Sequence, residues 1–415
     1  MKYYRALSDA DPMERKYETA DRIMEYGIYA YIVLMFLARG EGIRNIIIFG
    51  NFGLWLLTLR YRDNLQILKS PVSVLCWIYV LVSLFSVVFS INPFLSLKVF
   101  KGGILKFALL YPVIATVMTR RTRLENAAAT SFFTMIFIVG VAYYSFIFRD
   151  LEVLKPDTWL VHAWHNKFAQ YVNTLLPISC ILFFTWRRYV LRGVLAVSFF
   201  VSILALIFST SRGGYIAFLA IAFIWSFYLS KSRGFNLKKI VAYFMIGISI
   251  AAVCAFFYSS DVRKRLLLIS TQIYSFNERT EIWSAAGYAI ARRPLLGWGL
   301  GDSIFHLDEP YRGTPFDMKP PVKGPHNMLI EVMFHQGIIG LVPFITLIVY
   351  AAVIFWRDAF SVEGVRNYML VACVTILAGN YIIHNFLESI NKVEHLAVVL
   401  GLGMAAIGIH EDSGT

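Results

Sequence analysis

The chain has 415 residues, of which 58% are hydrophobic and only 16% are charged. Soluble domains are about 45–50% apolar and about 25% charged, so this composition excludes a disordered chain and argues against a soluble enzyme. On a soluble domain the net charge of +13 would indicate nucleic-acid binding, but in membrane proteins basic residues mark cytoplasmic loops. We therefore expect an integral membrane protein surrounded by lipids, with no nucleic-acid partner.

Apolar runs long enough to cross a bilayer recur along the chain. At about 20 residues per span, they predict an all-α polytopic membrane protein with about twelve transmembrane helices. The second run is short and the fourth contains three lysines, so these two depart most from the pattern. The predicted spans are residues 23–38, 43–59, 72–91, 96–118, 127–148, 166–185, 193–209, 214–230, 240–258, 326–355, 367–386 and 391–409.

Basic residues gather in every second short loop. These loops are residues 60–69, 120–123, 187–192, 231–239 and 357–366. Because short basic loops stay in the cytoplasm, the alternation predicts that both termini lie inside. Further basic residues lie toward the outer side, where they would favour an anionic ligand.

The long loop 259–325 is the one compositional break in the chain. It is rich in proline and contains the Trp/Gly-rich turn Pro294–Gly301, and its first half, 261–292, has helical periodicity. Loops of this length are usually functional or disordered, and the aromatic content argues against disorder. We therefore expect three parts: transmembrane helices one to nine in 1–258, a periplasmic cap in 259–325, and helices ten to twelve in 326–415.

Five polar clusters stand at the outer ends of predicted spans. Charged groups near the hydrocarbon cost about 2.5–3.5 kcal/mol each on insertion scales, so such clusters require a reason. We take them as candidate functional positions. The clusters are His165–Asn166, Ser209–Gly214, Asn277–Glu281, Pro325–Asn327 and His384–Glu388.

Two arginines are candidates for binding an anion. In Ser-Thr-Ser-Arg-Gly-Gly, glycines and hydroxyls expose hydrogen-bond donors, and Arg212 supplies a planar fork that suits phosphate oxygens. The alternative is a turn whose arginine reaches toward the membrane interface. Arg279 lies between Glu278 and Glu281, and the alternative there is a solvated salt-bridge cluster of little energetic weight.

His326 is the candidate general base, because it follows a proline at the first turn of a helix and imidazole exchanges protons near neutral pH. The alternative is a capping or packed histidine. For His165 and His384, packing and function are equal alternatives. The secondary candidates beside these histidines are Asn166, Asn327 and Glu388.

Lys98 and Lys101, with Lys106 at helical spacing, either line a groove for lipid phosphate or extend from the membrane toward water. The spacings of His, Asp, Glu and Cys typical of metal sites are absent from the sequence, as is a Walker loop. We therefore expect no metal and no cofactor. The chemistry indicated is acid–base catalysis with a leaving group stabilised by cations.

Taken in order, these segments resemble the bacterial O-antigen ligase/polymerase family. The segments are His165–Asn166 with Pro177 in the following helix, Ser209–Gly214, Glu278–Gly301 and, most clearly, the run Pro325–Leu341. Each motif is short, but the ordered set is fairly specific. The resemblance covers roughly residues 160–390.

This resemblance implies a GT-C-like glycosyltransferase in the bacterial inner membrane, with its active site facing the periplasm. Such enzymes take a glycan from undecaprenyl pyrophosphate without a metal ion. In ligases the acceptor is a sugar hydroxyl of the lipid A core, and in polymerases it is another lipid-linked glycan. By the same resemblance, His326 matches the essential histidine of the family, and Arg212 and Arg279 match its pyrophosphate-binding arginines.

The size of the loop between helices nine and ten favours a ligase in lipopolysaccharide biosynthesis, with a polymerase as the alternative. No second carboxylate nucleophile is evident, so we expect direct displacement with inversion. From another class, a lipid-linked glycan transporter would also hold polar residues in the membrane. The polar clusters lie at one face rather than the midplane, which argues against transport.

Overall fold

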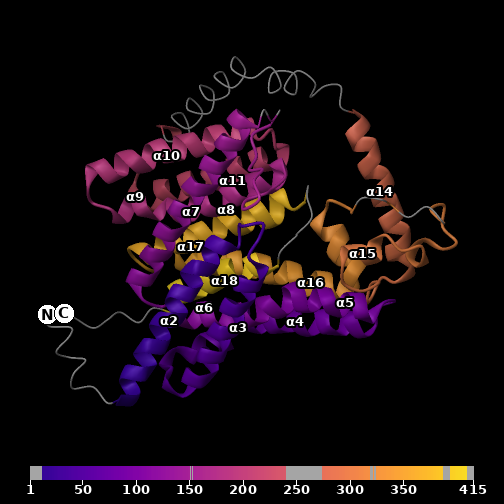
Figure 1. Ribbon diagram of the computed structural model, residues 1–415, viewed down its shortest axis with the longest axis horizontal. Helices are drawn as coiled ribbons and strands as arrows, with labels where there is room; N and C mark the ends of the chain where they lie inside the picture. Colours follow the sequence, from indigo (N-terminus) through magenta and orange to yellow (C-terminus); the bar gives the residue numbers. More distant parts are fainter. Residues whose placement is uncertain are drawn as a thin grey trace.

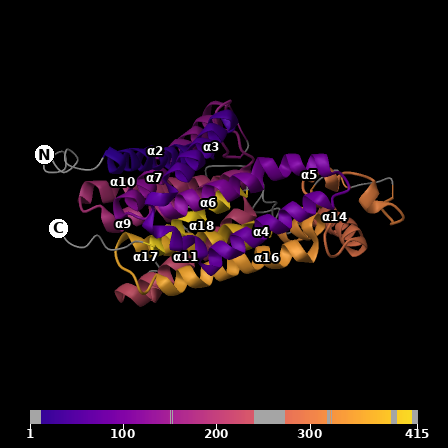
Figure 2. The same cartoon turned by 90° about the horizontal axis from the view of Figure 1, so that it is seen from below.

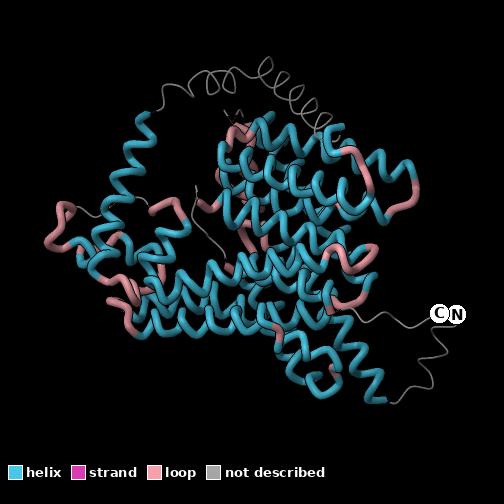
Figure 3. Tube along the Cα trace, turned by 180° about the vertical axis from the view of Figure 1, so that it is seen from behind, coloured by secondary structure: helices cyan, strands magenta, loops and turns pink. Residues whose placement is uncertain are grey.

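The computed structural model describes residues 12–149, 151, 153–239, 273–317, 321, 324–386 and 393–408. Within these ranges the chain is helical, and its β character is limited to one isolated bridge between Asp157 and His162 (Figure 3). Nine of the described helices are long and apolar enough to cross a membrane. The expected all-α polytopic membrane protein is thereby confirmed.

Every predicted span except 240–258 coincides with helical structure, and that span lies outside the described residues. The predicted cap helix is present as α14, while residues 259–272 also lie outside them. The helices before the cap are α2 (Pro12–Leu34), α3 (Glu41–Thr58), α4 (Pro71–Val88), α5 (Pro93–Val99), α6 (Leu105–Val117), α7 (Arg121–Phe148), α8 (His165–Ser179), α9 (Ile181–Thr185), α10 (Tyr189–Phe208) and α11 (Arg212–Arg233). Those that follow are α14 (Ile273–Arg292), α15 (Asp302–Phe305), α16 (Met328–Asp358), α17 (Val365–Ile376) and α18 (Glu394–Ile407).

Two spans contain π-helical turns. The lysine-bearing fourth span runs from α5 through the π-helical segment η3 (Phe100–Ile104) into α6, and α17 continues into a second π-helical segment, η6 (Leu377–His384). The π-helical turn is rare and is frequently found at functional sites. The lysines that interrupt the fourth hydropathy run therefore accompany a change of helix type rather than an end of the helix.

The most buried helices form the centre of the bundle. α18 lies along α6, and α17 packs against α18, α16 and α8. Close approach is possible where α18 has glycine: a Cβ at Gly401 would press on Ile114 of α6, and one at Gly403 on Phe355 of α16. The outer helices α3 and α10 instead expose large apolar side chains such as Leu57 and Val197, as expected for surfaces that face lipid.

Residues 273–317, which we call the cap, stand at one end of this bundle. Figures 1 and 2 show α14 at the end of the bundle where α4 is followed by α5, and Figure 1 shows α15 beside it. α16 begins at this end, since Trp298 of the cap donates from its backbone N–H to the Phe334 carbonyl at 2.9 Å. We call it the cap end.

A buried ion-pair cluster ties the opposite end together. Asp21 of α2 accepts from Arg62 at 2.9 Å and from Arg123 of α7 at 2.5 Å, and Arg123 also meets Glu25 at 3.0 Å. Both arginines and Asp21 are buried. Two basic residues of the loops predicted to be cytoplasmic are therefore joined to α2: Arg62 from the loop after α3, and Arg123 from the first turn of α7.

We expect Asp21→Asn to destabilise the protein by about 3–5 kcal/mol, because it leaves buried arginines without their counter-charge. Thermal unfolding in detergent micelles measures the change. The matched control is Glu125→Gln, which removes an exposed pair with Arg121 and should cost less than about 1 kcal/mol. Equal unfolding temperatures for the two variants would contradict the assigned role of the cluster.

Candidate functional site

The middle of α8 is joined to the start of α11 by a buried amide. Asn173 of α8 donates from Nδ2 to the Gly214 carbonyl oxygen at 3.0 Å. A Cβ at Gly214 would overlap Ala169, so glycine is what permits this close approach. The N-terminal half of α8, which begins with His165–Asn166, therefore packs against the start of α11, whose first residue is Arg212.

A second set of amides joins α8 to the end of η6 and the start of α16. Gln170 donates to Asn385 Oδ1 at 3.0 Å, and the Asn385 carbonyl accepts from the Met328 backbone N–H at 2.8 Å. Asn380 donates to Thr174 Oγ1 at 2.7 Å. The middle of α8, the start of α16 and the end of η6, which belong to elements carrying three of the predicted clusters, therefore meet.

The cap helix α14 joins the same region through an indole. Trp283 donates from Nε1 to the Pro325 carbonyl oxygen at 2.8 Å, one residue before His326. Arg279 precedes Trp283 by four residues, which places the two on one face of α14. The five helical segments that carry the predicted clusters are thus connected by hydrogen bonds at the cap end of the bundle.

The predicted site residues differ in their exposure. Arg212 and Glu281 are exposed, whereas Arg279, His326, His165 and Asn166 are partly exposed. His384 is buried, and Asn327 is buried as the N-cap of α16, where its Oδ1 accepts from the Leu329 and Ile330 backbone N–H groups. The Glu278 side chain and all of Glu388 lie outside the described residues.

The lysines of the fourth span divide into two kinds. Lys98 and Lys101 are exposed, while Lys106 is buried and pairs with Glu41 of α3 at 3.1 Å. Lys106 is thus a structural partner of Glu41, and the alternatives for the other two remain as predicted from the sequence.

Two non-glycine residues in the described part of the chain have positive φ, and both belong to predicted clusters. Thr210 has φ 56° and lies two residues before α11, and His326 has φ 46° and lies two residues before α16. A β-branched residue in this region is a clear outlier, and such strain costs of order 1–3 kcal/mol at each position. Strained residues cluster at ligand-binding and catalytic sites, so these two outliers support the assignment of the region as a site.

α16 is interrupted, and the cap fills the interruption. Gly337 has φ 64° and ψ −166°, which ends the helical ladder. The segment Pro294–Gly299 supplies the missing partners: Ile338 N–H donates to the Pro294 carbonyl at 2.8 Å, and Gly299 N–H donates to the His335 carbonyl at 3.0 Å. The Trp/Gly-rich turn and the histidine-bearing motif, identified separately in the sequence, are therefore parts of one structure.

The cap has a small core of its own that rests on α16. Trp298 and Phe305 pack with alanines of α14 against Phe334 of α16, and Trp298 Nε1 donates to the Ala289 carbonyl at 2.8 Å. Burial raises the pKa of the Tyr311 phenol in this core above its ordinary value. These residues of the cap therefore form a packed apolar core.

Sequence reasoning missed most of the residues that hold the site together, namely Gln170, Asn173, Asn380 and Trp283, and it included Asn385 only as part of the cluster His384–Glu388. A signal was available, because amides inside apolar spans usually make hydrogen bonds between helices. No group of three or more His, Cys, Asp or Glu side chains within the described ranges is placed to hold a metal ion.

Residues 197–345 match the family model described as O-antigen ligase. This segment contains Arg212, Arg279 and His326. An O-antigen ligase from Salmonella typhimurium (strain LT2) is 20% identical to the chain over 335 residues, which cover 78% of this chain and 80% of the relative. By both comparisons the chain is similar to the O-antigen ligases. The family match spans both the strained turn before α11 and the interrupted start of α16.

We expect Gly337→Ala to destabilise the protein, because a Cβ there would overlap the Leu295 carbonyl and strain of about 1–3 kcal/mol would be added. Thermal unfolding measures the loss. Gly287→Ala in α14 is the control: its Cβ meets nothing within 4 Å, and a helical alanine should stabilise by about 0.5–1 kcal/mol. Changes of the same sign in both variants would refute the role of Gly337.

Proposed function

We propose that this protein transfers an O-antigen glycan from undecaprenyl pyrophosphate to a sugar hydroxyl of the lipid A core. Its similarity to the O-antigen ligases supports a glycosyltransferase-type enzyme of lipopolysaccharide biosynthesis. The observation that carries the proposal is the hydrogen-bonded junction that gathers the middle of α8, the starts of α11 and α16, the end of η6 and the face of α14 at one end of the bundle.

In this proposal Arg212 and Arg279 bind the pyrophosphate. Arg212 opens α11, a helix of 22 residues, and the unpaired N–H groups and dipole of a helix N-terminus favour anions. Departure of a lipid pyrophosphate develops negative charge, which fixed cationic donors stabilise best in a site of low dielectric constant. Arginine suits this role because its planar guanidinium binds two phosphate oxygens at once.

His326 acts as the general base. The acceptor hydroxyl oxygen attacks the anomeric carbon while His326 takes its proton, and the bond from that carbon to the pyrophosphate oxygen breaks. Undecaprenyl pyrophosphate leaves with the bonding electrons, and a single displacement inverts the anomeric configuration. The strained backbone at His326 supports this role because strained residues are frequent at catalytic sites.

The proposed location is the bacterial inner membrane, with the cap end facing the periplasm. The alternation of basic loops supports this orientation, because the predicted cytoplasmic loops lie at the ends of helices remote from the cap. Lipid-linked donor and lipid A-core would then both reach the site from the outer leaflet.

We expect His326→Ala to lower the rate of glycan transfer by about 10²–10⁴-fold, the usual contribution of a general base. The assay supplies the purified protein with undecaprenyl-pyrophosphate glycan and lipid A-core and follows the glycan-bearing lipid A-core. The matched control is His162→Ala, an exposed histidine paired with Asp157, which should retain activity. Lengthened lipid-linked glycan as the product would instead identify a polymerase, and full activity of His326→Ala would exclude the base role.

We expect Arg212→Lys and Arg279→Lys each to lower the rate of transfer by about 10²-fold or more. A lysine ammonium keeps the charge but lacks the planar, two-pronged guanidinium, so part of the stabilisation of the leaving group is lost. Initial rates at several donor concentrations measure the effect. Arg121→Lys, which changes an exposed arginine at the opposite end of the bundle, serves as the control. Unchanged rates in both cap-end variants would remove the arginines from the mechanism.

A further inference from the structure

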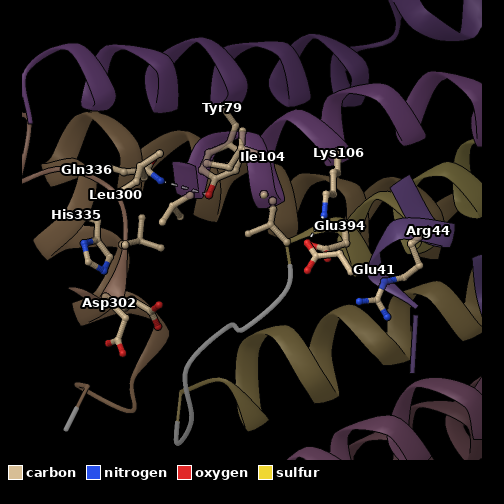
Figure 4. A pocket seen from close by; sticks show the side chains of 17 residues that line it. Glu41, Arg44, Tyr79, Ile104, Lys106, Leu300, Asp302, His335, Gln336 and Glu394 are labelled. Carbon is tan, nitrogen blue, oxygen red and sulfur yellow. Dashed lines mark hydrogen bonds and ion pairs between the residues drawn. The ribbon is translucent and has the colours of Figure 1, made fainter. Parts of the chain in front are cut away.

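A cavity of about 400 Å³ opens beside the first half of α16. Its walls come from α3, α4, the π-helical segment η3, the cap, α16 and the start of α18 (Figure 4). Small-molecule sites have volumes of roughly 300–1,000 Å³, so the space is large enough for a ligand. Arg212, Arg279 and His326 do not line it, and the functions proposed for them leave the cavity without a role.

Two glycines in the π-helical segment keep one wall of the cavity open. Gly102 and Gly103 lie in η3 and line the space. A Cβ at Gly102 would meet no other heavy atom within 4 Å. The two glycines leave this wall without side chains, and the π-helical turn in which they lie is a helix type that is frequent at functional sites. The cavity therefore follows from the sequence and is not a packing defect.

His335 presents a ring nitrogen to the cavity. The residue is 6% exposed, and its Nδ1 lies 2.8 Å from the Gly299 carbonyl oxygen. Because a carbonyl only accepts, Nδ1 carries the proton, and Nε2 of the neutral ring is a hydrogen-bond acceptor. Among the described residues Nε2 has no partner, so a ligand that donates a hydrogen bond would satisfy it.

The charges around the cavity argue against a phosphate ligand. Its carboxylates outnumber its cations, and the cations are already engaged: Lys106 pairs with Glu41 at 3.1 Å, and Arg44 donates to the Leu34 and Leu37 carbonyls, each at 2.9 Å. Burying an anion near an excess of carboxylates is unfavourable. The carboxylates lining the cavity are Glu41, Asp302, Glu331 and Glu394.

The polar groups that line the cavity, apart from its two cations, are of the kinds that bind hydroxyl groups. Carboxylates and the His335 nitrogen accept hydrogen bonds, while the Gln336 amide and the Tyr79 hydroxyl can both donate and accept. Hydrogen bonds from a neutral hydroxyl to a carboxylate are charge-assisted and therefore strong. A sugar ring presents several hydroxyls around an apolar body, and apolar residues such as Val332 and Ile104 also line the space.

We infer that this cavity binds an uncharged, hydroxyl-rich sugar ring of one of the two glycan substrates. The inference rests on the proposed function, because it assigns the cavity as a subsite of the same enzyme. Glu331 lies in the first turn of α16, five residues after His326, and both belong to the part of the chain before the Gly337 break. The sugar is thus held by the same short half-helix that begins beside the proposed base.

Gly102→Leu tests the inference by filling the cavity from a wall where a side chain has room. We expect the KM for one sugar-bearing substrate, either lipid A-core or lipid-linked O-antigen, to rise about ten-fold while the KM for the other stays unchanged. The substrate affected identifies the source of the sugar. The matched control is Gly140→Leu, another exposed helical glycine with nothing within 4 Å of its Cβ, which should alter neither KM.

His335→Asn provides a second variant, because an asparagine amide can still donate to the Gly299 carbonyl but offers no acceptor in place of Nε2. We expect the same KM to rise about three- to ten-fold, the usual effect of one lost hydrogen bond of about 0.5–1.5 kcal/mol. His335→Gln keeps a hydrogen-bond acceptor in place of Nε2 but loses the donor to the Gly299 carbonyl. It should therefore retain sugar affinity and lower the thermal stability.

Binding of free saccharides separates this inference from the transfer activity. Saturation-transfer NMR would compare core oligosaccharide and O-antigen saccharide, each released from its lipid, on the wild type and the two cavity variants. Saccharide binding that is lost in Gly102→Leu supports the site even if the wild type forms no transfer product, a result that would defeat only the proposed function. Equal binding and equal KM values in folded Gly102→Leu, His335→Asn and wild type would overturn the inference.

Discussion

The structure depends on how buried backbone groups are satisfied where α16 is interrupted. In an apolar bundle an unpaired N–H or carbonyl costs several kcal/mol, so a helix can stop at Gly337 only if another segment supplies partners. The cap segment Pro294–Gly299 does so on both sides of the break. This one exchange of hydrogen bonds attaches the cap to the bundle, orients the first half of α16 and creates a wall of the neighbouring cavity.

Side-chain amides play the same part at the other helix ends. Asn173, Asn380 and Asn385 connect helices that are distant in sequence. Such bonds between membrane helices are worth only about 0.6–2 kcal/mol each, yet they fix which helix starts meet. The polar junction and the strained turns at Thr210 and His326 occupy the same end of the bundle, whereas the opposite end is held by the ion pairs of Asp21.

Much of the fold was accessible from the sequence because the bilayer imposes a simple rule on each span separately. Lengths of apolar runs located the helices, and only residues such as Lys106 complicated the pattern. The site was partly accessible for the same reason: Arg212 and His326 were conspicuous as polar residues next to apolar runs. Gln170 and Asn173 could not be assigned to the site in this way, because the sequence around an amide within a helix does not indicate which residue it bonds.

The sequence by itself determined that the chain is a helical membrane protein with polar clusters at helix ends, since hydrophobic length and charge act locally along the chain. Only the tertiary structure decided that the Trp/Gly-rich turn inserts into α16, that Trp283 contacts the residue before His326, and that Gly102 and His335 share a cavity. Those relations join residues far apart in sequence. They depend on the packing of whole helices and the pairing of buried polar groups, which no local pattern records.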